Sequence, residues 1–378
     1  MTLNLWKLSL ILLLVAGVIF GANAIWNKPM IIVPAGGSAA QVSPAAPTKP
    51  PAVSSAAAAP YQVANLPARK ILPIPYHVFQ SFNNCAPAAL AIALSYYDIH
   101  KTQQELAADL RPYNNPQGIN DDKSTVPEEL GAEAAKFGLI PYYRANGNID
   151  LLRQFISAGI PVVMRTLLHD NENFAHYRVV KGYNNTTREL IQDDSYENKN
   201  LRFSYDKFLT LWQQFNYEYL ILVPPGKQAV AEGILGESLD PVASWQGAVR
   251  TASAELAQDP NDLRAGFNLS VALYNTGDYQ GSVDAYEKVQ SRLPQITLWY
   301  QIQPIQAFFE IGDYARVMSL TSAVLAKNIS FSELYILRGK VYIEQGQPEL
   351  AKKEFQQALF YNKNLKSAQE ALTSVGSG

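Results

Sequence analysis

The chain has 378 residues with 31 basic and 33 acidic side chains, so its formal net charge is only −2. This balance provides no basic surface of the kind that binds nucleic acid, and we expect no nucleic-acid partner. The Walker-type phosphate loop is absent from the sequence, so we also expect no nucleotide. The length is large for one domain, and the presence of one cysteine excludes an internal disulfide.

The N-terminal segment predicts export. Lys7 precedes an almost unbroken run of Leu, Ile, Val, Phe and Ala from 8 to 22. Residues 22–24 have the small-x-small form of a signal-peptidase site, but apolar character resumes directly afterwards, as in an uncleaved anchor. We therefore expect residues 1–30 to be a signal peptide or a transmembrane anchor, and the protein to be extracytoplasmic, either membrane-anchored or secreted. Residues 31–68 are rich in Pro, Ala and Ser and predict an extended tether.

The only cysteine, Cys85, stands at the start of an apolar, alanine-rich stretch. Pro87 is tolerated only in the first turn of a helix, so the helix is expected to begin within a residue or two of Cys85. The helix dipole favours a thiolate there, which makes Cys85 a candidate nucleophile. The alternative is a small buried side chain with no chemical role, which is the commonest state of a free cysteine.

A histidine and an aspartate follow on two predicted strands. His176 lies in a β-branched and aromatic stretch from 174 to 183, and Asp194 follows the short strand 189–192. Cysteine on a helix, histidine on a strand and a carboxylate after the next strand is the chain order of a papain-like site. Asp193 remains an alternative to Asp194, because neighbouring residues on a strand point to opposite faces.

The other three histidines give no comparable pattern. His77 and His100 flank the predicted nucleophile helix, outside any strand-turn context. His169 has Asp170 and Glu172 nearby, but no second histidine or cysteine stands at ligand spacing. We therefore expect no metal site.

Together these motifs resemble the C39-type cysteine peptidases, in the stand-alone C39-like branch. The resemblance runs from Ile71 to Pro225 and rests on four places in the right order. These are Gln80 five positions before Cys85, the run Asn-Cys-Ala-Pro-Ala-Ala-Leu from 84 to 90, His176-Tyr177 before Val-Val-Lys-Gly-Tyr, and the aspartate after the following strand. Two departures are Ala86, where the family usually has glycine, and Ser195, where it usually has proline.

The resemblance implies an α+β, papain-like cysteine peptidase domain at residues 69–226. In it Cys85 would be the nucleophile, His176 the general base and then acid, and Asp194 the group that orients the imidazole. Gln80 would donate its amide N–H to the oxyanion, together with a backbone N–H near Cys85. The implied reaction is hydrolysis of a peptide or protein substrate through an acyl-thioester, without a cofactor or metal.

The C-terminal part carries an internal repeat. Gly-Asp-Tyr, Gly-Asp-Tyr and Gly-Gln-Pro begin at Gly277, Gly312 and Gly346, at intervals of 35 and 34 residues. This period resembles that of tetratricopeptide repeats and predicts an all-α domain at 240–378, with each glycine ending the first helix of a hairpin. Stacked repeats commonly bind peptide segments, so we expect a protein partner there; a passive capping or self-association role is the alternative.

Two other functional classes fit the same residues. A C39-like domain that has lost activity would leave a peptide-binding or scaffold protein in which the repeats act. An amidase or acyltransferase acting on cell-wall peptides would use the same three catalytic groups and differ in its product. A thiol of ordinary reactivity would favour the first class, and product analysis would identify the second.

Overall fold

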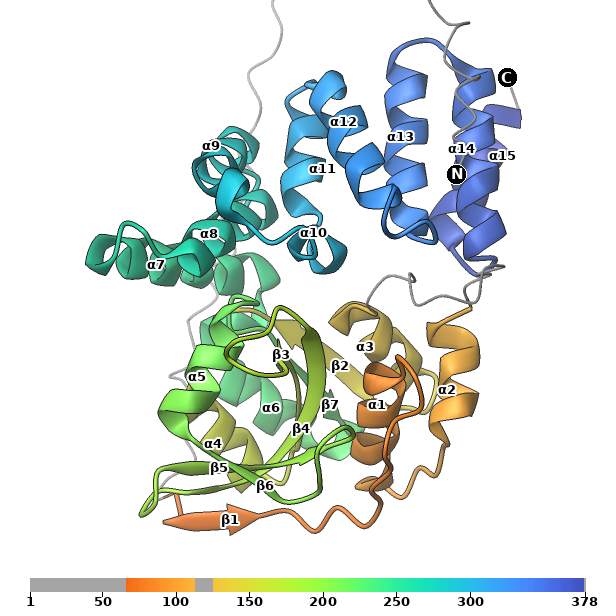
Figure 1. The fold of residues 1–378 in the computed structure, drawn as a ribbon. Coiled ribbons are helices and arrows are strands. Elements are labelled where there is room, and N and C mark those ends of the chain that lie inside the picture. The colour runs from red at the N-terminus through yellow and green to blue at the C-terminus, as the bar shows by residue number, and fades with distance from the viewer. Residues whose placement is uncertain (1–65, 113–124, 377–378) are drawn as a thin grey trace, which may run out of the picture. The chain divides into compact units, whose positions relative to one another are not determined.

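The computed structural model describes residues 66–112 and 125–376 (Figure 1). The predicted export segment at 1–30 and most of the predicted tether at 31–68 lie outside the described residues. Within the two described ranges, no helix is long and apolar enough to cross a membrane. The described residues fall in one compact unit that spans 57–378.

A seven-stranded antiparallel sheet forms the first part of this unit. The strand order is β2-β7-β3-β4-β5-β6, and β1 pairs separately with β4. The strands are β1 (Arg69–Ile71), β2 (Ile140–Arg144), β3 (Val162–Leu167), β4 (Ala175–Asn184), β5 (Glu189–Asp194), β6 (Leu201–Ser204) and β7 (Tyr219–Val223). The strands predicted around His176 and at 189–192 are therefore β4 and β5, which are direct neighbours; β5 runs on to Asp194, so Asp194 ends this strand rather than following it.

Helices cover both faces of the sheet, because side chains alternate along each strand. Val163 and Val179 pack with α1, α2 and α3, whereas Val162 and Val180 pack with α4, α5 and α6. These helices are α1 (Cys85–Ser95), α2 (Gln103–Leu110), α3 (Pro127–Ala135), α4 (Ile149–Ser157), α5 (Tyr205–Gln213) and α6 (Gln228–Leu235). Residues 86–95 of α1 are all buried, so this helix is firmly anchored at the centre of its layer. The predicted α+β class is confirmed.

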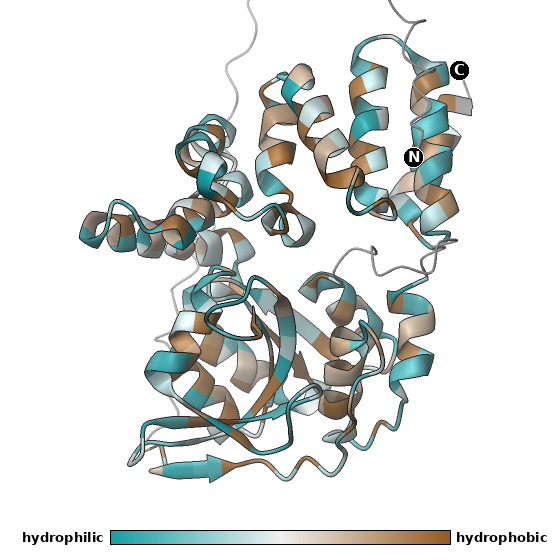
Figure 2. Ribbon diagram, in the orientation of Figure 1, coloured by the Kyte–Doolittle hydropathy of each residue, from teal (hydrophilic) through white to brown (hydrophobic). Residues whose placement is uncertain are grey.

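The second part of the unit is helical, as predicted. Its helices are α7 (Pro241–Gln258), α8 (Leu263–Asn275), α9 (Tyr279–Val289), α10 (Thr297–Tyr300), α11 (Gln303–Glu310), α12 (Tyr314–Leu325), α13 (Ser332–Glu344), α14 (Pro348–Tyr361) and α15 (Lys366–Gly376). Figure 2 shows apolar and polar bands alternating along these helices, as expected when each helix buries one stripe against its neighbours.

The three repeated glycines end the first helices of three hairpins. Gly277, Gly312 and Gly346 have φ values of 85°, 80° and 68°, a conformation in which glycine has no Cβ penalty. Asp278 and Asp313 then cap the second helices by accepting hydrogen bonds from backbone N–H groups three residues further on. The hairpins are α8–α9, α11–α12 and α13–α14, with α7 before them and α15 closing the array.

The helical part packs directly on the sheet. Ser244 Oγ in α7 accepts from Ala145 N at 2.9 Å and donates to Ala145 O at 2.8 Å. The ring of Trp245 meets Tyr143 edge to face at a centroid distance of 6.4 Å. Because Tyr143 and Ala145 come from β2 and its end, the first apolar cluster of the repeats includes residues of the sheet domain.

Candidate active site

Helix α1 begins at Cys85, within the range of a residue or two that Pro87 predicted. Pro87 lies in the first turn, where a missing N–H breaks no helical hydrogen bond. The first turn leaves the N–H groups of Cys85 and Ala86 without partners inside the helix, so both are potential donors to a negative charge next to the thiol. Cys85 itself is partly exposed, although the residues that follow it are buried.

The loop before Cys85 is held by side chains of α2 and the residue after it. Gln103, which is buried, accepts from Ser81 N at 2.8 Å through Oε1 and donates to Phe79 O at 2.9 Å through Nε2. Arg111 Nη1 donates to Asn84 Oδ1 at 2.9 Å. These contacts fix the loop that leads to Cys85, and the sequence contains no local motif that would have identified Gln103 or Arg111.

His176 lies between the thiol and a carboxylate. Its Nε2 lies 3.0 Å from Asp194 Oδ1, and the exposed fraction of the His176 side chain is only 4%. The thiol of Cys85 lies within hydrogen-bonding reach of the same imidazole. Since Nε2 is engaged by Asp194, Nδ1 is the ring nitrogen left for Cys85. The three predicted residues are therefore brought together in the order Cys85, His176, Asp194.

Asp194 is surrounded by donors. Its Oδ1 also accepts from Tyr196 N at 2.7 Å and from Glu197 N at 2.9 Å, and its Oδ2 lies 2.7 Å from Arg178 Nε. Burial raises the pKa of Asp194, but the hydrogen bond and charge of His176, the charge of Arg178 and the Glu197 N–H outweigh it and hold this pKa below its usual value. Asp194 is therefore an anion next to the imidazole.

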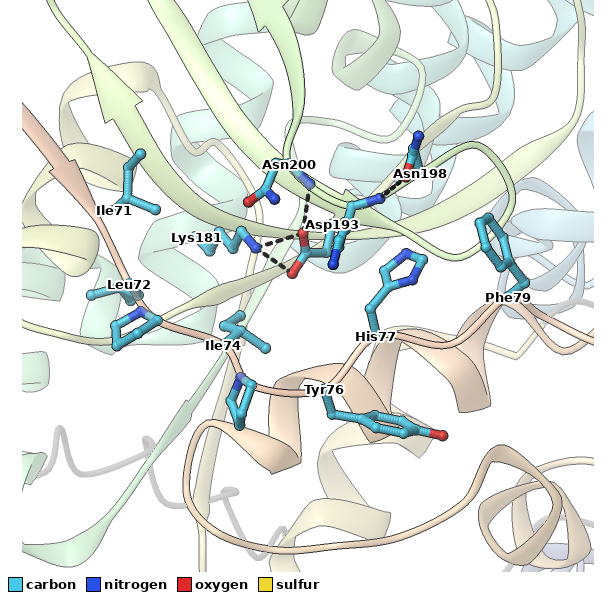
Figure 3. A pocket seen from close by; sticks show the side chains of 13 residues that line it. Ile71, Leu72, Ile74, Tyr76, His77, Phe79, Lys181, Asp193, Asn198 and Asn200 are labelled. Carbon is cyan, nitrogen blue, oxygen red and sulfur yellow. Dashed lines mark hydrogen bonds and ion pairs between the residues drawn. The ribbon is translucent and has the colours of Figure 1, made fainter.

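Asp193 has a different partner on the other face of β5. Its carboxylate accepts from Lys181 Nζ at 2.7 Å and from Asn200 N at 2.8 Å. Figure 3 shows this ion pair at the wall of a pocket lined by residues 71–77, 79 and 198–200. His77 lies in the same wall, and its Nε2 is 3.0 Å from the backbone oxygen of Asp194. Of the two neighbouring aspartates, only Asp194 contacts His176.

The thiol and imidazole shift each other's pKa. Burial raises the pKa of Cys85, but the hydrogen bond and charge of His176, the Tyr177 backbone and the charge of Arg111 lower it, and the net pKa lies below its usual value. Burial lowers the pKa of His176, yet its hydrogen bonds to Asp194 and Cys85 raise it above its usual value. Both shifts favour a thiolate beside an imidazolium, which is the reactive form of such a pair.

Gln80 lies beside the aspartate end of the site. Its backbone N–H donates to Ser195 O at 2.8 Å, and its side-chain Oε1 accepts from Ser195 Oγ at 3.0 Å. Ser195 directly follows Asp194, so the same short segment contacts both Gln80 and, through the carboxylate, His176. The departure from the family pattern at position 195 was the only sequence signal for this contact.

The remaining histidines lie elsewhere. His100 is exposed and bonds to Asp98 at 2.9 Å. His169 lies between Glu172 and Glu197, at 3.0 and 2.9 Å, on the surface. Among residues 66–112 and 125–376, no group of three or more His, Cys, Asp or Glu side chains could hold a metal ion.

Exposed aromatic side chains flank the candidate site along the chain. Phe82 is 72% exposed and stands three residues before Cys85, and Phe174 is 57% exposed and stands two residues before His176. Tyr196 is 60% exposed, and its ring meets the His176 ring edge to face at 6.3 Å. Apolar rings open to solvent are able to contact the apolar side chains of another molecule.

The comparisons with known proteins agree with these observations. Residues 71–220 match the model of the Peptidase_C39 like family, and residues 332–372 match a tetratricopeptide repeat. The chain carries a C39-like domain followed by helical repeats. Both resemblances are thereby confirmed, while the expected domain bounds of 69–226 and 240–378 stay predictions. The comparison with curated proteins found no match.

Three solved structures illustrate the likeness. A crystal structure described as a C39-like peptidase from Bacillus anthracis is 17% identical over 41% of this chain and 97% of that one, with a TM-score of 0.35. The peptidase domain of Streptococcus ComA, a bi-functional ABC transporter, is 22% identical over 39% of this chain and 96% of that one, with a TM-score of 0.32. MamA is 17% identical over 36% of this chain and 78% of that one, with a TM-score of 0.32.

Proposed function

We propose that the C39-like domain is a cysteine peptidase that uses Cys85, His176 and Asp194. The observation that carries this proposal is the buried imidazole in contact with a thiol on one side and a carboxylate on the other. Burying charged groups is costly, and a domain that only binds peptides gains nothing from shifting the pKa of a thiol downward. The arrangement therefore favours catalysis over an inactive scaffold.

In the first half of the reaction the Cys85 thiolate attacks the carbonyl carbon of the scissile amide. The carbonyl oxygen becomes an oxyanion, which accepts hydrogen bonds from the N–H of Cys85 and from Gln80 Nε2. His176, as the imidazolium, gives its Nδ1 proton to the leaving nitrogen. The C–N bond then breaks and the amine departs. The acyl group stays bound to Cys85 as a thioester.

In the second half a water molecule attacks the thioester. Neutral His176 takes one proton from this water, and the resulting oxyanion is bound by the same donors as before. Collapse of the intermediate releases the carboxylic acid and returns the thiolate and the imidazolium. Asp194 keeps the ring in one orientation and stabilises its positive charge in both halves without itself being protonated.

We further propose that the enzyme works outside the cytoplasm and that its repeats bind a protein partner or substrate. The first idea rests on the apolar segment 8–22 and the Pro/Ala-rich stretch after it. The second rests on the repeat fold and its stacked hairpins. Protease accessibility on intact cells tests the location, because a cytoplasmic protein with an intact N-terminus would refute it.

The function is tested with a pool of dye-quenched octapeptides of varied sequence. Cys85→Ala and His176→Ala should each lower cleavage of the pool at least about a thousandfold, and the double variant should lose little more, because members of one mechanism are non-additive. His100→Ala is the matched control, since that histidine is exposed and bonds to Asp98 on the surface. Full activity in Cys85→Ala would refute the peptidase proposal.

A further inference from the structure

Ser195 occupies an unusual place for a serine. Its side chain is buried, with only 1% of the residue exposed, and it directly follows the carboxylate that contacts His176. Its Oγ donates to Gln80 Oε1 at 3.0 Å, and its carbonyl accepts from Gln80 N at 2.8 Å. Gln80 is therefore held by Ser195 at both its backbone and the end of its side chain.

The hydroxyl contact determines which end of the amide is available. A glutamine amide has an accepting oxygen and a donating nitrogen, and here the oxygen is occupied by Ser195. Among the described residues, Gln80 Nε2 has no hydrogen-bond partner. The arrangement leaves the donor end unoccupied, as a group that binds a developing negative charge requires.

The contact also removes freedom from a flexible side chain. Glutamine has several rotatable bonds, and ordering it during the reaction would cost conformational entropy. A donor that is already in place contributes more to the transition state than one that must be ordered first.

We propose that Ser195 is a positioning residue that holds the Gln80 amide with its N–H end toward the oxyanion. This inference rests on the proposed function, because Gln80 has an oxyanion to bind only if Cys85 attacks a carbonyl. Ser195 touches no reacting atom and acts only through Gln80. The segment 194–195 then serves both halves of the site: the Asp194 carboxylate orients the imidazole, and the Ser195 hydroxyl orients the amide.

The test is a double-mutant cycle measured on the best-cleaved peptide of the octapeptide pool. Gln80→Ala should lower kcat about a hundredfold or more with little change in KM, because the group contacts only the oxyanion. Ser195→Ala should lower kcat about five- to twentyfold, again with KM nearly unchanged, as expected for losing one hydrogen bond. Ser195→Thr keeps the hydroxyl and should recover most of this loss.

The deciding measurement is Ser195→Ala in the Gln80→Ala background. If Ser195 acts through Gln80, this second change has no further effect on kcat. Multiplicative losses, or a Ser195→Ala effect confined to KM, would overturn the proposal while leaving the peptidase function intact. Full activity in Cys85→Ala would instead overturn both the role of Ser195 and the peptidase function. The two proposals therefore fail in different experiments. Unfolding of each variant in urea verifies that the single changes leave the fold in place.

Discussion

Replacing Asp194 with asparagine should separate the two roles that the structure gives this carboxylate. Asp194 contacts the imidazole of His176, and it is also the counter-charge of Arg178. The side chains of Arg178 and Asp194 are both 0% exposed. Asparagine keeps nearly the same shape and can still accept from the N–H groups of Tyr196 and Glu197. What it removes is the negative charge.

The stability cost follows from Arg178. Removing one partner of a buried ion pair costs about 3–5 kcal/mol, because the other charge stays buried without compensation. Arg178 also donates to the carbonyls of Leu167 and Leu168, each at 2.8 Å, and these bonds remain. We therefore expect about 3 kcal/mol, at the low end of that range, measured as the change in the free energy of unfolding in urea.

The pH dependence of this cost has a definite sign. Because the pKa of Asp194 in the folded state lies below its usual value of 3.8, its stabilisation is present above that value and is lost as the pH falls through the folded-state pKa. The difference in stability between wild type and Asp194→Asn should therefore shrink in acid, below about pH 4, and it should also fall as the pH rises through the raised pKa of His176, because the contact with Asp194 is part of what raises that pKa.

Asp193→Asn is the matched control. Asp193 and Lys181 are also both buried, so this change should cost stability too, but it leaves the contact between Asp194 and His176 untouched. At a temperature where both variants are folded, Asp194→Asn should lower kcat clearly and Asp193→Asn should barely change it. The loss in Asp194→Asn should stay below that of Cys85→Ala. Equal kcat losses in the two aspartate variants, or an Asp194→Asn stability within 1 kcal/mol of wild type, would refute this reasoning.

Two further predictions concern the pH profile and the repeats. Because the charge of Arg111 lowers the pKa of Cys85, Arg111→Gln should move the acid limb of the kcat/KM profile to higher pH. Lys136→Gln, on the surface, is the control and should leave the limb in place. An acid limb that does not move in Arg111→Gln would contradict the electrostatic role of Arg111. Residues 243–377 expressed alone should be predominantly helical by circular dichroism, because each hairpin packs on the next, and substantial strand content would contradict this assignment.

Local signals made part of this structure predictable. Pro87 fixed the start of α1, because proline is excluded from later turns, and three glycines marked the hairpins, because each adopts a positive φ that other residues avoid. Hydrophobic and β-branched content identified β4 and β5, and with them His176 and the aspartates. In each case the information lies within a few residues of the feature it predicts.

Contacts between distant segments account for what the sequence left open. The choice between Asp193 and Asp194 depends on the register of β5 against β4, in which Asp194 lies opposite Arg178 and Asp193 opposite Val179. This register is set by the whole sheet, so the local sequence, in which two aspartates stand side by side, cannot predict which one faces His176. Gln103 is similar, because its bonds to the loop before Cys85 join residues more than twenty positions apart.

Contacts between distant segments also decide how separate the two domains are. The repeat period suggests a separable module, yet a buried ion pair of the sheet domain, Arg165 with Glu218 at 2.6 Å, is completed by residues of the repeat region. Gln301 Nε2 donates to Glu218 Oε1 at 3.1 Å, and Arg165 Nη1 donates to Tyr300 O at 3.4 Å. Arg165 lies on β3, beside the strand that carries His176. Removing the repeats would therefore leave polar groups of the sheet that carries His176 without these partners, so we expect the repeats to contribute to the stability of the sheet as well as to any binding.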